Sequence, residues 1–235
     1  MAAAHVQHRS AFSTSGLTIS LAFSSNNTAG NLLVYVVGSS SVTGNNRCTD
    51  NNSNTIANAV NTGSGAASNS IDYAANCKSG PNTVSYDGTG TSGNPQTHLH
   101  IWEISGCVTT SVLGDTGTVS NNPTGSVSTS GTSTQVGDAV IGSFHDGNSP
   151  PTLTGDAGYS PIVDTAVASP AFKEQLSEFK AATSSGTQTA TCTGNGTQVL
   201  EQGIATFIAT VLTYEDDTPP RLKSGGFDPN VTVWQ

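Results

Sequence analysis

The sequence feature that most constrains the fold is an unbroken apolar run from Leu32 to Val37. Its residues are β-branched, aliphatic or aromatic, and the turn-forming residues 29–31 and 38–39 flank it. A short, Val-rich apolar run between turn residues is typical of a strand that is buried on both faces. We therefore expect Leu32–Val37 to be the central strand of a β-sandwich.

The rest of the chain also favours strands over helices. Only 10% of the residues are charged, against about 25% in an ordinary domain, and exposed helix faces need such residues. About a dozen short strand-like segments alternate with turn signals, and residues 97–105 form the second strongest of them. Residues 172–182 fit both helical and strand spacing, and we predict a strand there because the neighbouring segments are strands. The sequence thus predicts an all-β protein, a two-sheet antiparallel β-sandwich of jelly-roll-like form without a strict internal repeat.

Three regions are expected along the chain. Residues 1–14 carry no strong pattern and are predicted to be an N-terminal arm, residues 15–214 the β-sandwich domain, and residues 215–235 a C-terminal arm. The second arm begins with acidic residues and a Pro-Pro pair and ends in an apolar, β-prone stretch that favours pairing or burial. Its apolar side chains are predicted to contact another subunit: Phe227, Val231, Val233 and Trp234.

The charge balance restricts the classes of partner. The net charge is −9 with only seven Lys and Arg residues, so the basic stripe of a nucleic-acid-binding protein is missing and an anionic membrane is not expected as a partner either. No segment approaches the ~20 apolar residues of a membrane span. The first ten residues hold no apolar core of a secretory signal. We expect neither nucleic acid nor a membrane as a partner.

Four cysteines are widely spaced, and none of them forms the close pairs that zinc sites use. Cys48 and Cys77 end adjacent predicted strands, which makes them the first candidate pair for a disulfide. Four buried free thiols in a reducing compartment are the alternative.

Two groups of residues could hold a metal ion. Asp50, Asn52 and Asn54 offer the oxygen ligands that open a calcium loop, although the Gly and Glu that should follow are absent and an Asn/Asp turn explains the same run. His98 and His100 leave one face of a predicted strand, where His145 and Asp146 could complete a transition-metal site; a polar sheet rim is the favoured alternative. No cofactor is predicted.

The sequence contains few residues that indicate catalysis or sugar binding. Glu103 lies on a strong predicted strand and is the natural carboxylate for a glycosidase, but no second carboxylate is identifiable beside it. The nucleophile-elbow motif G-x-S-x-G is absent. Tyr159 is the aromatic residue that we expect to be exposed and able to stack on a sugar ring. The sequence therefore predicts a protein that is not an enzyme.

Several motifs occur in a familiar order: AGNLLV at 29–34, TDNNSNT at 49–55, YAANCKSGPNTV at 73–84, WEISG at 102–106 and GDAVIG at 137–142. In this order they resemble a β-sandwich module of bacterial surface proteins and of phage tail and other virion-associated proteins. The resemblance covers residues 15–213 and implies no catalytic residues. The chain departs from the module at Cys48 and Cys77, where aliphatic residues are usual.

The resemblance and the composition together suggest a function. We expect a non-enzymatic structural protein of a bacteriophage virion, such as a capsid decoration, collar or fibre subunit, that forms a homo-oligomer and contacts other virion proteins. A weakly charged Ser/Thr surface suits such packing, and the acidic balance keeps a free subunit soluble. The alternative is an extracellular or cell-surface module for adhesion or carbohydrate binding, with a cell-surface glycan as partner.

Overall fold

The structure is a computed structural model that describes residues 1–14, 18–39, 48–63, 68–88, 96–122, 126–146, 153–164, 174–194 and 200–211. These residues form fifteen β-strands and no helix, so the predicted all-β class is confirmed. Within the same residues no helix is long and apolar enough to cross a membrane.

The first eight strands build two antiparallel sheets. They are β1 (Ala4–Ser13), β2 (Thr18–Ala22), β3 (Leu32–Ser39), β4 (Cys48–Asp50), β5 (Ala57–Gly63), β6 (Ser68–Ala74), β7 (Thr83–Asp87) and β8 (Thr97–Ser105). One sheet has the order β1-β8-β3-β6-β5 and the other the order β2-β7-β4. We call this part of the chain the N-terminal half.

The last seven strands build a second pair of sheets. They are β9 (Leu113–Asn122), β10 (Ser126–Ser133), β11 (Ala139–Asp146), β12 (Ile162–Asp164), β13 (Glu174–Ala181), β14 (Gly186–Thr193) and β15 (Leu200–Phe207). The larger sheet has the order β12-β13-β11-β15-β9, and β10 pairs with β14 in the smaller one. We call this part the C-terminal half.

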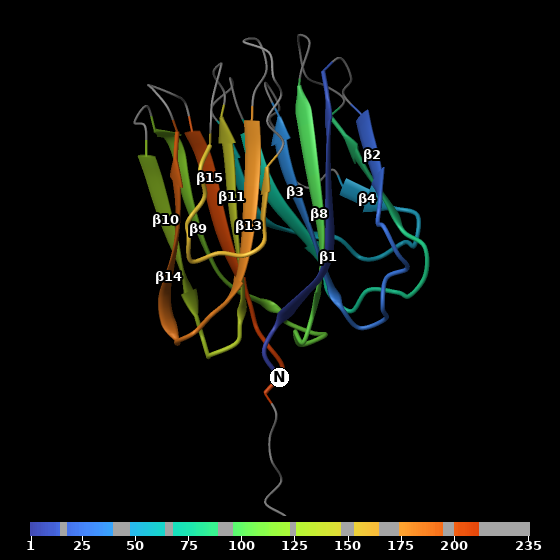
Figure 1. The fold of residues 1–235 in the computed structure, drawn as a ribbon. Coiled ribbons are helices and arrows are strands. Elements are labelled where there is room, and N and C mark those ends of the chain that lie inside the picture. The colour runs from blue at the N-terminus through green and yellow to red at the C-terminus, as the bar shows by residue number, and fades with distance from the viewer. Residues whose placement is uncertain are drawn as a thin grey trace, which may run out of the picture.

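The four sheets are stacked as four layers, with the two five-stranded sheets in the middle (Figure 1). Three apolar clusters fill the three gaps. Val36 and Ile141 belong to the central cluster, Tyr35 to the cluster under β2-β7-β4, and Phe144 to the cluster under β10-β14. The sequence predicted one two-sheet sandwich, whereas the structure contains two, packed face to face.

The two halves have the same topology, apart from β4, which has no counterpart among the described strands of the C-terminal half. Read from matching edges, the larger sheets are β1-β8-β3-β6-β5 and β9-β15-β11-β13-β12, and the pair β10-β14 corresponds to β2-β7. The order β1-β8-β3-β6 beside β2-β7-β4 is that of a jelly roll, except that β5 pairs with β6. Glycines with positive φ stand at matching turns before the central strands, Gly30 at 89° and Gly137 at 92°.

The central strands show why the apolar runs were informative. All eight residues of β3 and all eight of β11 are buried, because each strand lies in the middle of its sheet with another layer on both faces. The ambiguous segment 172–182 contains strand β13, in which Leu176 and Phe179 point into different clusters on opposite faces. The predicted strand is therefore confirmed and the helical alternative is wrong.

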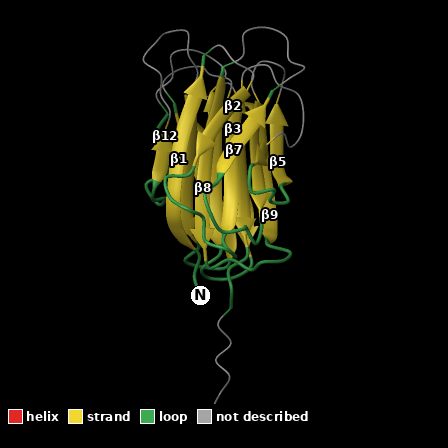
Figure 2. Cartoon of the chain, turned by 90° about the vertical axis from the view of Figure 1, so that its right-hand side faces the viewer, coloured by secondary structure: helices red, strands yellow, loops and turns green. Residues whose placement is uncertain are grey.

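The N-terminal arm is a correction to the sequence analysis. Residues 4–13 form β1, which pairs along its length with β8 at the edge of a central sheet. In Figure 2 the edge strands β1 and β12 lie on one side of the molecule and β5 and β9 on the other. The predicted C-terminal arm, 215–235, lies outside the described residues.

Candidate functional site

Glu103, the candidate catalytic carboxylate, is fully buried and holds a turn of its own half. Its oxygens accept hydrogen bonds from the side-chain amides of Gln7, Asn27 and Asn31 and from the backbone N–H of Thr28. Burial alone would raise the pKa of this carboxyl, but the four hydrogen bonds outweigh it and the pKa is lowered. An ionised carboxylate with its acceptor positions occupied is suited to structural support and not to proton donation.

Asp138 has the corresponding structural role in the C-terminal half. Its side chain accepts hydrogen bonds from the backbone N–H groups of Thr134, Gln135 and Ala209 and from the hydroxyls of Ser133 and Thr134, at 2.8–3.2 Å. As in Glu103, burial opposes ionisation and the hydrogen bonds outweigh it, so the pKa is lowered. Both carboxylates therefore stabilise turns of the fold through hydrogen bonds.

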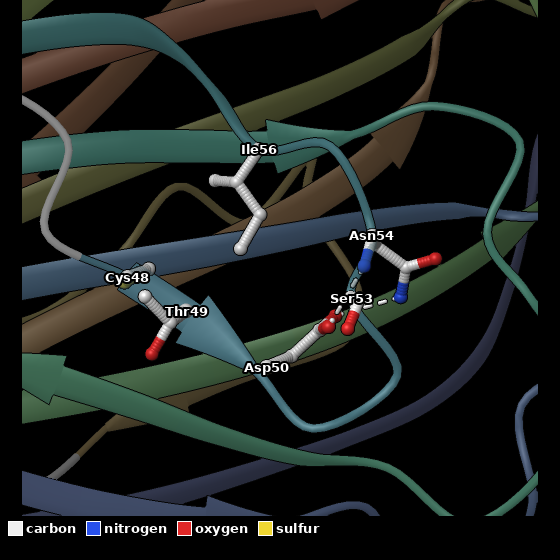
Figure 3. Close-up of a pocket in the computed structure, with 6 residues that line it drawn as sticks. All are labelled: Cys48, Thr49, Asp50, Ser53, Asn54 and Ile56. Atoms are coloured by element: carbon white, nitrogen blue, oxygen red, sulfur yellow. Dashed lines mark hydrogen bonds between the residues drawn. The ribbon is translucent and has the colours of Figure 1, made fainter.

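The candidate calcium turn lies beside a pocket of about 360 Å³ (Figure 3). Asp50 and Asn54 are brought together: the Asn54 backbone N–H and side-chain amide donate to the Asp50 carboxylate at 3.0 and 2.7 Å. Tyr35 and Asn82 also donate to that carboxylate. The pocket is lined by Cys48, Thr49, Asp50, Ser53, Asn54 and Ile56.

A protein cation already contacts this turn. The Lys78 ammonium donates to the backbone carbonyls of Asn52 and Ser53, at 3.0 and 2.9 Å. The described residues contain no group of three or more His, Cys, Asp or Glu side chains that could hold a metal ion. The hydrogen bonds of Asp50 account for the Asp/Asn run as a turn, and calcium binding there stays a prediction.

Cys48 and Cys77, the first candidate pair for a disulfide, are free and buried, as are Cys107 and Cys192, which agrees with the alternative of four buried free thiols. The Cys77 thiol donates to the Thr28 carbonyl at 3.1 Å. Burial and the neighbouring Asp72 carboxylate raise the pKa of Cys48 well above its ordinary value, and burial raises that of Cys77 to about 11. Thiols of this kind are unreactive at neutral pH.

Tyr159 is not an exposed aromatic, so this expectation is also wrong. Only 3% of its surface is exposed, its hydroxyl donates to the Thr189 carbonyl at 3.0 Å, and the Lys180 ammonium lies 4.3 Å from its ring centre. The ring fills the gap between the central sheet and the outer pair β10-β14. It cannot form a sugar-stacking platform in this position.

The predicted histidine pair is real but not at a rim. His98 and His100 leave the same face of β8, and the ring of His145 lies 5.7 Å from that of His98 across the gap between the central sheets. All three are buried. Asp146 follows His145 in β11 and therefore points to the opposite face, so it does not join them.

The surface that sequence reasoning missed is the long edge strand β1. Among the described residues β8 is the only strand that pairs with β1, and Val6 and Phe12 on β1 are 45% and 43% exposed. Three further exposed apolar side chains, Met1, Val136 and Val211, belong to the end of the molecule where β1 begins and where the described chain stops. The predicted contact residues 227–234 lie outside the described residues.

Comparison with known proteins adds no relative: no family model, no curated protein and no solved structure matches this chain. The resemblance to the bacterial and phage β-sandwich module stays an expectation from the motifs.

Proposed function

We propose that the protein is a non-enzymatic structural subunit of a bacteriophage virion that acts by assembling with copies of itself and with other virion proteins. The observation that carries this proposal is the edge strand β1, which presents ten residues of backbone beside the exposed side chains of Val6 and Phe12. Edge strands pair readily with strands of other chains.

The interior supports the same function. The buried carboxylates of Glu103 and Asp138 are occupied by hydrogen bonds from their own turns, and the four layers are filled by packed side chains. A densely packed body with apolar residues on an edge strand and at one end suits contacts between proteins. The apolar end of the C-terminal arm, including Val233 and Trp234, is proposed to supply the contact between subunits.

The oligomeric state tests this proposal. We expect the full chain to have the mass of an oligomer in light scattering, and deletion of residues 219–235 to lower that mass to a monomer, because the deletion removes the apolar contact residues. A monomeric full chain, or an unchanged oligomer after the deletion, would contradict the role of the arm.

A matched variant separates the arm from the edge strand. Phe12→Lys places a charge on the exposed part of β1 and leaves the arm intact. If β1 contributes to assembly, this variant also lowers the mass at a fixed concentration. Lys78→Gln, a charge change at the turn that follows β4, leaves the mass unchanged.

A further inference from the structure

All five histidines of the chain lie along one gap, the space between the two central sheets. They are His5, His8, His98, His100 and His145, and we call them the histidine seam. They come from three strands, β1, β8 and β11, so the seam spans the N-terminal and C-terminal halves.

The rings are in contact or near contact along the seam. The ring nitrogens of His5 and His8 are 2.9 Å apart, and both rings pack on Trp102 with centroids at 5.7 and 5.1 Å. His100 hydrogen-bonds across the gap to the Ser177 hydroxyl, with 2.8 Å between Nδ1 and Oγ. The Trp102 indole N–H donates to the same hydroxyl at 3.1 Å.

Further hydrogen bonds across the gap join uncharged side chains. Asn69 of the N-terminal half accepts a hydrogen bond from the Ser143 hydroxyl at 2.6 Å and donates to the Ser143 carbonyl. Gly38 makes room for the closest approach, since a Cβ there would lie 2.4 Å from the His145 Nδ1 atom and 1.8 Å from Gln175 Oε1. Close packing of this kind keeps the rings of His98, His100 and His145 away from solvent.

Few charged groups face the seam. Strand alternation places one described carboxylate on this side of the central sheets, that of Glu201 on β15, opposite His145 in the register. The other described charged side chains of the strands in the two central sheets point to the outer faces: Arg9, Asp72, Glu103, Asp115, Asp146, Glu174, Glu178 and Lys180.

Protonation of three of the five rings, those of His5, His8 and His100, is unfavourable in the folded protein. Burial lowers the pKa of His5, His8 and His100, and the neighbouring His98 and His8 lower that of His100 further. A group with a lowered pKa in the folded state stabilises the fold fully above its ordinary value near 6.5, and this stability is lost as the pH falls through the folded-state value.

We propose that the histidine seam is an acid-sensitive interface between the two halves of the protein: uncharged rings hold the central sheets together at neutral pH, and protonation separates the sheets. Each half keeps its own two sheets when the gap opens, because its own apolar cluster lies between them. This inference is independent of the proposed virion function.

Trp102 provides the measurement. The chain has two tryptophans, so in a Trp234→Phe variant the fluorescence comes from Trp102 alone, which is fully buried beside the seam. Between about pH 7.5 and pH 5 we expect its emission to shift to the red and its quenching by acrylamide to rise, while the far-UV circular dichroism stays that of a β-protein. Each linked proton changes the opening equilibrium about tenfold per pH unit.

Variants distinguish titration from lost packing. In the same background, His5→Gln with His8→Gln is expected to reduce the steepness of the opening by about one proton for each histidine replaced. These two side chains are only half-buried, so this variant retains the fold. The control Ser177→Ala removes the hydrogen bonds to His100 and Trp102 and is expected to shift the midpoint without changing the steepness.

Three results would overturn the inference. The first is a Trp102 that stays protected down to pH 5. The second is an unchanged steepness in the double histidine variant. The third is loss of the β-sheet signal at the same pH as the fluorescence change, since this would show that acid unfolds the whole chain. Glu178 also titrates, and its protonation stabilises the fold as the pH falls. This contribution is the same in each variant and its parent, so it cancels in the comparison.

Discussion

The two halves share one topology but use different residues to hold the turn before the central strand. In the N-terminal half, Glu103 reaches from β8 and accepts from Thr28 and Asn31 in the turn. In the C-terminal half, Asp138 stands in the turn itself, at the place that corresponds to Asn31, and accepts from Gln135. Both halves therefore place a buried carboxylate at this turn, and it comes from the neighbouring strand in one half and from the turn itself in the other.

A second pair of buried carboxyl groups, those of Asp72 and Glu178, also occupies corresponding places in the two halves with different neighbours. Asp72 pairs with Tyr35 in the register and Glu178 with Gly142, at corresponding places in the two halves. Tyr35 fills its gap in the N-terminal half, whereas Gly142 leaves room for the longer Glu178 side chain: a Cβ there would lie 2.9 Å from Glu178 Oε1. A large and a small residue therefore exchange places between the two strands of the pair.

The largest effect is expected from removing the turn carboxylates. Glu103→Ala removes the acceptor that the side-chain amides of Gln7, Asn27 and Asn31 share and should lower the free energy of unfolding by about 3–5 kcal/mol at pH 7. Asp138→Ala should cost a similar amount if the two carboxylates are equivalent. Urea unfolding measures both. A loss below about 1 kcal/mol in either variant would break the equivalence.

The next effect concerns how stability depends on pH: two buried carboxyl groups stabilise the fold at low pH, whereas the histidine seam stabilises it at high pH. Burial raises the pKa of Glu178 to about 8, and burial raises that of Asp72 as well. The folded protein thus keeps these protons to a higher pH than the unfolded chain does. Their stabilisation is complete below the unfolded-state value near 4.5 and is lost as the pH rises toward 8.

Glu178→Gln tests this sign directly. Between pH 5 and pH 7 the variant should lose about 2–3 kcal/mol less unfolding free energy than the parent, because glutamine does not titrate. Asp72→Asn should act in the same direction. Chemical unfolding at several pH values measures the slopes, and parallel curves for parent and Glu178→Gln would contradict the raised pKa.

A smaller effect is expected where the halves meet. Gly38 is the seventh residue of β3, and His145 is the seventh residue of β11. Gly38→Ala forces a methyl group into Gln175 and His145 and should cost on the order of 2 kcal/mol by overpacking. The control Gly158→Ala, whose Cβ would meet only Asp156 Oδ1 at 3.4 Å, should change stability by less than about 0.5 kcal/mol. Equal losses in both variants would show that the gap is not tightly packed.

The sequence predicted the buried central strands and missed two strands at sheet edges, β1 and β9. Leu32–Val37 and residues 97–105 lie in β3 and β8, whose apolar residues are continuous because both faces are covered. β1 and β9 escaped prediction because an edge strand with one half-exposed face carries His, Ser, Thr and Gly in place of an apolar pattern. The sequence was also no guide to the burial of Tyr159 or to the separation of Cys48 from Cys77. Both depend on how the sheets are stacked, which the local sequence does not show.

Sequence alone determined that the chain is built from strands, because strand formation depends on local alternation, turn residues and the scarcity of charged residues. Tertiary structure decided that two sandwiches pack face to face, and that His5, His98 and His145 all face the gap between them. These residues lie far apart along the chain, and only the pairing of strands and the stacking of sheets bring them to one gap. The local sequence pattern does not specify which strands pair or which sheets stack, because both depend on contacts between residues that are distant in the sequence.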